Sequence, residues 1–422
     1  MAELTPGMNQ EEEPLKQRSA IFLASVIISI TSGQFALLFY LPALPLIGQD
    51  LHVHGAVVEN SVAFFLYGFG ISQLIYGNLS DSFGRKKILI IGIIILAIGV
   101  FMTYLCNSAN TLLLSRLIQG LGGGAIAIIP RTILTDSYKG TKFIKAVTVV
   151  MLVLSLMPAV APTIGGGIVT YFSWRILFLV LFVYVVFVLF VVIFLIPETL
   201  EKAKRTRFNV KMITKNYSIL FKDKKYLSYM FCVMFSYTAM IIYMTFTAFI
   251  YEGVFSFTPG RYGLIMIIPA LFLALGCSSS LWLPKFTGKA PNIDKSILIG
   301  SSIMIIGAVC LFLICMFGLK TDWIVLGCVS VIAIGVGFIF TTSTAGMLQS
   351  CTHAIGAGAS FSGFVQMIGN GVILFLLSKF KMYNSLYIGV WSCVFGIILL
   401  AMIVFLKRVK SAEVQLDIAI EK

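Results

Sequence analysis

The sequence predicts an all-α integral membrane protein in which twelve transmembrane helices form two six-helix bundles. The first indication is composition: 59% of the 422 residues are hydrophobic and only 11% are charged, which is foreign to soluble domains of this length. The second is the length of the apolar runs, because a bilayer core of about 30 Å requires about 20 apolar residues per helix. These runs are continuously apolar and do not alternate, which excludes a transmembrane β-barrel.

Twelve apolar runs follow one another along the chain, and each predicts one helix. They cover 20–44, 57–79, 88–106, 111–134, 144–170, 174–196, 227–251, 261–283, 296–317, 323–345, 357–378 and 385–406. The polar segment 197–226 is the longest interruption, and it divides the runs into six and six. We therefore expect an N-terminal tail (1–19) without the features of a cleavable signal, a first bundle (20–196), a basic linker (197–226), a second bundle (227–406) and a C-terminal tail (407–422).

The distribution of basic residues predicts the orientation. Most of the 31 Lys and Arg lie in the two tails and in alternate loops, whereas the opposite loops hold Arg175, Arg261, Lys320, Lys379 and Lys381. By the positive-inside rule, both termini are predicted to be cytoplasmic in a multi-pass protein of a cell inner membrane. The net charge of +14 is then a topology signal, with anionic lipids of the inner leaflet rather than nucleic acid as the expected partner.

The chain gives no indication of a cofactor, a metal site or an enzyme. The eight Cys are scattered, mostly inside predicted helices, without the paired spacing of metal ligands. Gly122 to Gly124 lies inside an apolar run with no following Lys-Ser/Thr, so it is no phosphate loop. A membrane enzyme would need clustered His, Asp or Glu, and a receptor would need a sizeable soluble domain. Neither is found.

One charged loop between the second and third runs has a recognisable pattern. It reads Gly77-Asn78-Leu79-Ser80-Asp81-Ser82-Phe83-Gly84-Arg85-Lys86-Lys87. One acid, three bases and a glycine near each end resemble the signature loop of the major facilitator superfamily of transporters. The resemblance implies the major facilitator fold, with a solute site between two bundles that open alternately to either side.

Other motifs narrow the resemblance to the Bcr/CflA group of drug:proton antiporters. They are Tyr40-Leu41-Pro42-Ala43-Leu44-Pro45, Pro158-Ala159-Val160-Ala161-Pro162-Thr163-Ile164-Gly165-Gly166-Gly167 and Pro197-Glu198-Thr199-Leu200. The resemblance implies a monomeric secondary transporter that exports small amphiphilic solutes, with H⁺ as the coupling ion. It also implies a conformational role for the antiporter-type motif, whose key residues are Pro158, Pro162, Gly165 and Gly166.

The same resemblance implies a latch on the cytoplasmic side. Its expected members are Gly77, Asp81, Gly84, Arg85, Arg131 and Asp136. Arg85 is expected to pair with Asp136, and Asp81 is expected at the N-terminus of the eleventh span, where the helix dipole favours a carboxylate. We expect the latch to hold the two halves together on the inside. The alternative interpretation is an ordinary solvated loop.

Arg116 is the leading candidate for solute binding. It lies about one turn inside the fourth span, and a charged residue within a span is a functional hypothesis by default. The alternative is a structural arginine bonded to backbone carbonyls. No acid lies at the middle of a span, and Glu59 comes closest. Further candidates for the solute site are Gln34, Tyr40, Gln119, Tyr237, Tyr243, Gln366 and Asn370.

Leu38 marks a departure from the Bcr/CflA pattern, which has an acid two residues before the Tyr of Tyr-Leu-Pro. A proton-coupled antiporter needs a group that loads and releases H⁺, and an acid in the cavity is the simplest such group. Two hypotheses therefore stay open. One is drug or metabolite efflux of the Bcr/CflA type. The other is transport of an anionic metabolite or carboxylate siderophore, with coupling that does not depend on a first-span acid.

Overall fold

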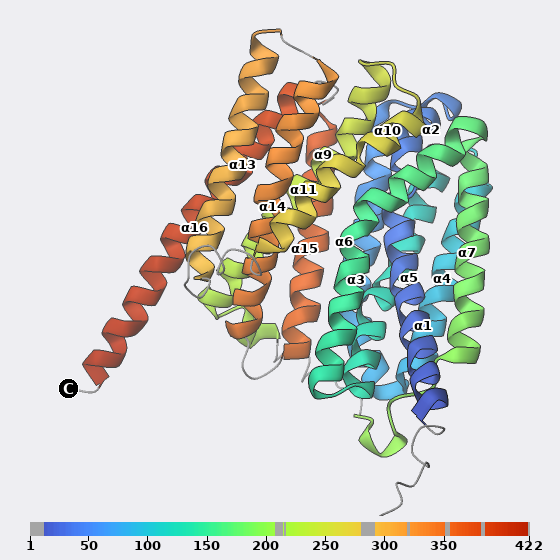
Figure 1. Ribbon diagram of the computed structural model, residues 1–422, viewed down its shortest axis with the longest axis vertical. Coiled ribbons are helices and arrows are strands. Elements are labelled where there is room, and N and C mark those ends of the chain that lie inside the picture. Colours follow the sequence, from blue (N-terminus) through green and yellow to red (C-terminus); the bar gives the residue numbers. More distant parts are fainter. Residues whose placement is uncertain are drawn as a thin grey trace, which may run out of the picture.

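The computed structural model describes residues 12–206, 214, 217–279, 292–318, 321–350, 355–380 and 385–420. All regular elements in these ranges are helical, and twelve spans are long and apolar enough to cross a membrane. The six N-terminal spans form the right half of Figure 1 and the six C-terminal spans form the left half. The predicted fold class, two six-helix bundles, is confirmed.

The N-terminal half begins with a span that proline residues break into three pieces. Pro42 lies in the first turn of η1 and Pro45 in the first turn of α2, positions where the missing N–H costs nothing. The elements are α1 (Glu12–Leu38), η1 (Leu41–Ala43), α2 (Leu44–Asp50), α3 (Gly55–Phe83), α4 (Arg85–Tyr104), α5 (Ala109–Ser137), α6 (Gly140–Tyr171) and α7 (Trp174–Leu195), followed by the short η2 (Lys202–Lys204).

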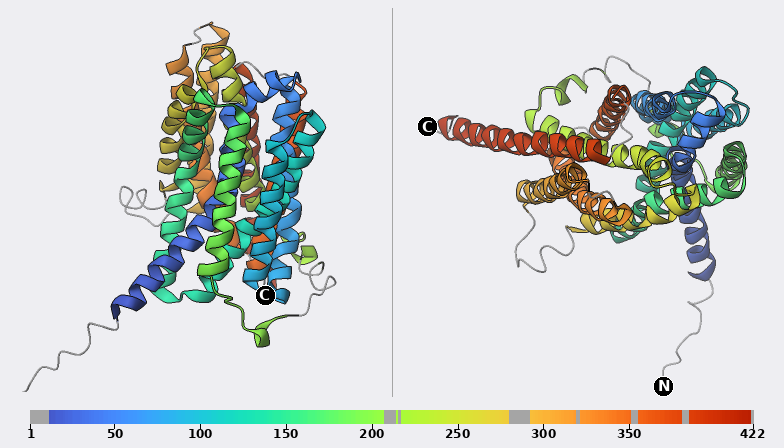
Figure 2. Two further views of the ribbon diagram at one scale, coloured as in Figure 1. Left: turned by 90° about the vertical axis from the view of Figure 1, so that its right-hand side faces the viewer. Right: turned by 90° about the horizontal axis from the view of Figure 1, so that it is seen from above.

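The C-terminal half repeats this pattern with a different broken span, in which α10 and α11 together cross the membrane. Its elements are α9 (Lys224–Gly253), α10 (Pro259–Ile265), α11 (Ile267–Cys277), α13 (Ile293–Met316), α14 (Asp322–Ser350), α15 (Ile355–Ser378) and α16 (Ser385–Ile420). Within the predicted linker (197–226), residues 207–213 and 215–216 lie outside the described residues. Helices α1 and α16 continue into the segments predicted as tails, and Figure 2 shows both projecting from the bundles.

Glycines allow the helices of the N-terminal half to approach closely. A Cβ atom at Gly120 would lie 2.0 Å from the carbonyl oxygen of Phe65 on α3, and one at Gly122 would lie 2.3 Å from the amide nitrogen of Leu96 on α4. Without a hydrophobic force between helices in lipid, such close van der Waals packing stabilises the bundle. The glycine run of α5 is therefore a packing stripe.

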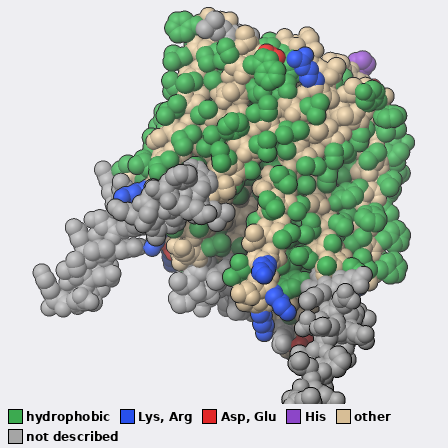
Figure 3. Space-filling view, in the orientation of Figure 1, with side chains coloured by type: hydrophobic (Ala, Val, Ile, Leu, Met, Phe, Trp, Pro, Cys, Tyr) green, Lys and Arg blue, Asp and Glu red, His purple; other side chains and the backbone are tan. Residues whose placement is uncertain are grey.

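The outer surface fits a bilayer. In Figure 3, hydrophobic side chains cover most of the visible face, and the Lys and Arg side chains gather mainly near its lower edge. Large apolar side chains such as Phe194 and Ile98 are 75% and 51% exposed, a state that lipid but not water tolerates on this scale.

Candidate functional site

Arg116 lies in the interior of the N-terminal half and is 0% exposed. Its Nη1 donates to the carbonyl oxygen of Ala36 (2.9 Å) and to Oε1 of Gln119 (2.5 Å). Its guanidinium carbon lies 4.0 Å from the ring centroid of Tyr40 and 4.6 Å from that of Phe65. Cation–π contacts of this kind stabilise a desolvated guanidinium.

The end of α1 takes the place of an acidic partner for this arginine. Ala36 is one of the last residues of α1, whose final carbonyls have no partner within the helix and form its negative dipole end. A cation at this point satisfies a carbonyl and is itself stabilised. This explains how Arg116 is buried without an ion pair to any described acid.

Gln119 extends the network to α4, where its Nε2 donates to Oγ1 of Thr103 (2.5 Å) and to the carbonyl oxygen of Gly99 (3.2 Å). The hydroxyls of Tyr40 and Ser61 lie 3.1 Å apart and add α3. The structure therefore brings together three candidates, Arg116, Gln119 and Tyr40, but as a buried knot within one half. In this conformation Arg116 and Gln119 offer no accessible surface to a solute.

The candidates of the C-terminal half lie elsewhere, on α9 and α15. Oδ1 of Asn370 accepts a hydrogen bond from Thr238 (2.5 Å), and Gln366 is 8% exposed one turn earlier on α15. Tyr243 is buried, whereas Tyr237 is half-buried with its ring centroid 5.9 Å from that of Phe340. Gln34 on α1 is also half-buried, so Gln34 and Tyr237 both keep part of their surface exposed.

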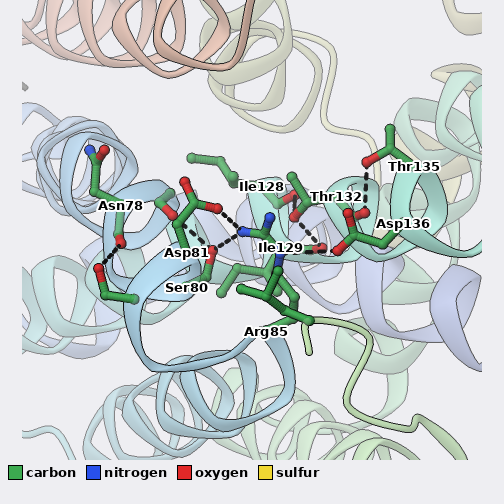
Figure 4. A network of polar contacts seen from close by, with 12 residues as sticks. Asn78, Ser80, Asp81, Arg85, Ile128, Ile129, Thr132, Thr135 and Asp136 are labelled. Atoms are coloured by element: carbon green, nitrogen blue, oxygen red, sulfur yellow. Dashed lines mark hydrogen bonds and ion pairs between the residues drawn. The ribbon is translucent and has the colours of Figure 1, made fainter. Parts of the chain in front are cut away.

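The charged residues at the inner end of α3 form a network, shown in Figure 4. Nη1 of Arg85 donates to Oγ of Ser80 (2.8 Å) and to the carboxylate of Asp81, and Nε donates to Oδ2 of Asp136 (3.2 Å). The expected contact between Arg85 and Asp136 is present. Arg131 is exposed on α5, and among the described residues no ion pair joins it to this network.

We expected the latch to join the two halves, but this network does not do so by itself. Asp81, Arg85 and Asp136 lie on α3, α4 and α5, which all belong to the N-terminal half. The contact with the other half is made one turn earlier by Gly77, where a Cβ atom would lie 3.2 Å from Oγ of Ser360 on α15. The turn before α15, at 351–354, lies outside the described residues, and the expected position of Asp81 against it is a prediction that stays open.

Glu198 and Thr199 belong to the same network, a role that was not predicted from the sequence. Oε1 of Glu198 accepts from the backbone N–H of Arg85 (2.9 Å), and Oγ1 of Thr199 donates to Oδ2 of Asp136 (3.2 Å). Gly84, with φ +106°, turns the chain between α3 and α4, and a Cβ there would lie 2.4 Å from Oε2 of Glu198. The Pro-Glu-Thr-Leu motif could have pointed to these two residues. The sequence alone, however, does not show that the carboxylate of this motif reaches the N-terminus of α4.

We expect Glu198→Ala to lower the stability of the protein by about 1–3 kcal/mol, because it removes a charged acceptor from the first turn of α4. Thermal unfolding of the purified protein in detergent measures this loss. Glu198→Gln, which keeps an oxygen acceptor for the N–H of Arg85 but loses the charge, is the matched control and is expected to lose less. Equal unfolding midpoints for the two variants would contradict the assignment.

The antiporter-type motif of α6 lies where the two halves meet on the outer side. Oγ1 of Thr163 donates to the carbonyl oxygen of Gly263 (2.8 Å), and the N–H of Gly260 donates to Oγ1 of Thr170 (2.8 Å). A Cβ atom at Gly166 would lie 2.3 Å from the carbonyl oxygen of Pro259, and one at Gly165 would lie 1.9 Å from that of Phe39. This half of α6 is thus pressed against α10 and the end of the first span, at the end of the molecule that the sequence predicts to face outward.

Comparison with known proteins agrees with this architecture. The sequence profile of the Major Facilitator Superfamily matches residues 21–374. The bicyclomycin resistance protein homolog of Haemophilus influenzae is 27% identical, over 87% of this chain and 92% of that protein. Multidrug resistance protein D of Escherichia coli is 24% identical, over 91% and 95%.

Solved structures show the same fold. The xylose transporter XylE from E. coli, in a partially occluded inward-open conformation, superposes with a TM-score of 0.70 at 12% identity, over 92% of this chain and 98% of that one. The human organic anion transporter MFSD10 gives a TM-score of 0.60 at 15% identity, over 91% and 99%. A profile match over most of the chain, twelve spans in two halves and the signature loop together establish that this chain belongs to the Major Facilitator Superfamily of transporters.

Proposed function

We propose that this transporter exports small amphiphilic organic solutes, in the manner of the bicyclomycin and multidrug resistance proteins that it resembles. The observation that carries the proposal is the match to these resistance proteins over most of both chains, within the major facilitator fold. The partly exposed candidate residues agree with it. Tyr237 beside Phe340 offers an aromatic wall, and Gln34 a hydrogen-bonding group. Binding sites of this kind favour apolar ligands with a few polar groups.

The burial of Arg116 weakens the competing hypothesis of an anionic solute. Its Nη1 bonds to the end of α1 and its guanidinium lies against two aromatic rings, whereas Nε and Nη2 have no hydrogen-bond partner among the described residues. Because the side chain is 0% exposed, it presents no accessible positive charge in this conformation. One observation still favours an anion, namely the exposed side chain of Arg131 on the inner half of α5. Transport of an anionic metabolite or siderophore is therefore the second candidate.

Export assays in a bacterial host that lacks its main efflux pumps separate the two candidates. We expect the protein to lower the accumulation of ethidium and to raise resistance to bicyclomycin, and we expect an uncoupler to abolish both effects. Gly166→Val, whose effect is argued in the Discussion, is the inactive control. Unchanged ethidium accumulation together with uptake or export of labelled citrate would favour the anion hypothesis.

The proposal includes the setting of the protein. We place both termini in the cytoplasm of a cell inner membrane, since the basic residues lie mainly at one end. The functional units are the bundles 20–196 and 227–406, joined by a linker (197–226) whose bases contact anionic lipids of the inner leaflet. The chain works as a monomer, with a small-molecule solute as its partner, and has no enzymatic activity.

A further inference from the structure

Glu59 is a buried acid that nothing described so far employs. It lies on α3, one turn after the helix begins at Gly55, and is 0% exposed. Both of its carboxylate oxygens are without a hydrogen-bond partner among the described residues, and no described base forms an ion pair with it. A helix that only needed packing at this position would be served better by an apolar side chain.

The titratable groups on the elements packed around this end of α3 are directed to other partners. On α5, Arg116 bonds to Ala36 and Gln119; on α2, Asp50 pairs with Arg175 at 2.6 Å. The hydroxyl of Tyr40 contacts Ser61. The remaining titratable groups on these elements and across the interface are His52, His54, Tyr104, Tyr251, Glu252 and Lys379, and none is bonded to Glu59.

A pocket of about 530 Å³ lies between the two halves at the end of α3 that carries Glu59, although Glu59 itself does not line it. Its walls come from α2, from the turn before α3 and from Phe249, Gly253 and Val254 at the end of α9. Gly55 lines the pocket and precedes Glu59 by four residues, so both lie on the same face of α3. The carboxyl group is therefore one helical turn below an outer vestibule.

The state of this carboxyl group depends on whether the outer side is closed. A carboxylate anion buried without a cation or a donor is strongly destabilised, whereas a neutral carboxylic acid is tolerated at far lower cost. When α2 and α9 separate, water from the vestibule reaches Glu59 and the anion becomes stable. Closure of the outer side and protonation of Glu59 are thus linked.

We propose that Glu59 is a proton-binding site of the outer gate. As the gate closes, the carboxylate accepts H⁺ from hydronium in the outer solution, which leaves a neutral carboxylic acid and water. This inference rests on the alternating-access function proposed above, and it supplies a proton-loading group in a chain that has Leu38 at the place of the first-span acid.

The gate is tested by thiol labelling from the outside. Val169 is 5% exposed on the outer half of α6, one turn after Gly165, and Val169→Cys places a reporter thiol there. Cells that express this variant are treated with a membrane-impermeant maleimide at external pH values from 5 to 9. The unsubstituted chain gives the background labelling of the native Cys residues. Because maleimide reacts with the thiolate, the rate at each pH is divided by that of Tyr171→Cys, a reference thiol at an 83% exposed position of the same helix. We expect this ratio to rise with pH by up to about tenfold per pH unit, the slope for release of one proton.

Glu59→Gln in the same reporter background is expected to keep the ratio of the two labelling rates low and independent of pH, because glutamine is neutral and matches the protonated acid in shape. Glu252→Gln changes another poorly partnered acid near the outer end of α9 and should keep the rise with pH. The proposal is overturned if the reporter chain shows no pH dependence, or if Glu59→Gln keeps it.

These outcomes are independent of the solute. Ethidium export by a chain with pH-independent labelling would leave the proposed function intact and reject the proton site. The opposite result is a chain that exports no ethidium but shows pH-dependent labelling, which Glu59→Gln abolishes. It would support the proton site and reject the solute.

Discussion

We expect Gly166→Val to lower export by about tenfold or more, and Gly167→Val to leave it close to the wild-type rate. The two glycines are neighbours on α6, but they face different surroundings. A Cβ atom at Gly166 would lie 2.3 Å from the carbonyl oxygen of Pro259 and 3.4 Å from Cα of Gly260, whereas nothing lies within 4 Å of one at Gly167. Only the first substitution therefore forces α6 and α10 apart.

The size of the effect follows from the closed state of the outer side. Overpacking costs about 1–3 kcal/mol when flexible side chains can yield, and here the obstructing group is backbone. Each 1.4 kcal/mol lowers the population of the closed state about tenfold, so we expect export to fall by about tenfold or more. The initial rate of ethidium export at equal expression measures this. Since both variants put valine for glycine in the same helix, their helix propensities cancel. Export at wild-type rate by Gly166→Val would show that this contact is not needed for transport.

Arg116→Ala lowers the stability of the whole N-terminal half. The carbonyl oxygen of Ala36 and Oε1 of Gln119 lose their donor in a region without water, and each unsatisfied buried group costs about 1–3 kcal/mol. The contacts with the rings of Tyr40 and Phe65 are lost as well. Part of this loss is offset, because the variant no longer has to bury the charged guanidinium in the protein interior. We expect a net loss of about 2–4 kcal/mol.

Thermal unfolding in detergent is the measurement, and Arg131→Ala is the matched control because Arg131 is an exposed arginine on the same helix. We expect Arg131→Ala to unfold close to the wild-type temperature. If Arg116→Ala unfolded at the wild-type temperature but lost export, a direct contact with the solute would be favoured, as the sequence first suggested.

The spans were predictable because membrane insertion is a local requirement. Each run of about 20 apolar residues must become a helix in lipid, whatever its neighbours are. The ends were less predictable: α5 extends from Ala109 to Ser137, beyond the predicted 111–134, because polar residues at the membrane surface continue the helix. The signature loop contains Asp81 and Arg85, and the family resemblance predicted that Arg85 pairs with Asp136, a contact that the structure contains.

The role of each charged residue was not predictable in the same way. Sequence shows that Arg116 lies within a span, but only the packing of α1 against α5 shows that the end of α1 compensates its charge. Glu198 is far from Arg85 in the chain, and its bond to the N-terminus of α4 depends on where the chain leaves α7. Glu59 was noted as the acid closest to a midplane, yet its isolation became visible only with its neighbours in place.

The sequence by itself determined that this chain crosses a membrane twelve times and belongs to a transporter superfamily, because hydropathy and short motifs are written in consecutive residues. Only the tertiary structure decided that Gly166 of α6 packs against the backbone of α10 and that Arg116 is enclosed in one half. It also decided that Glu59, one turn from a pocket-lining residue, has no hydrogen-bond partner among the described residues. Those properties depend on contacts between helices that are distant in sequence, and a shift of a fraction of an ångström changes such a contact from favourable packing to steric overlap.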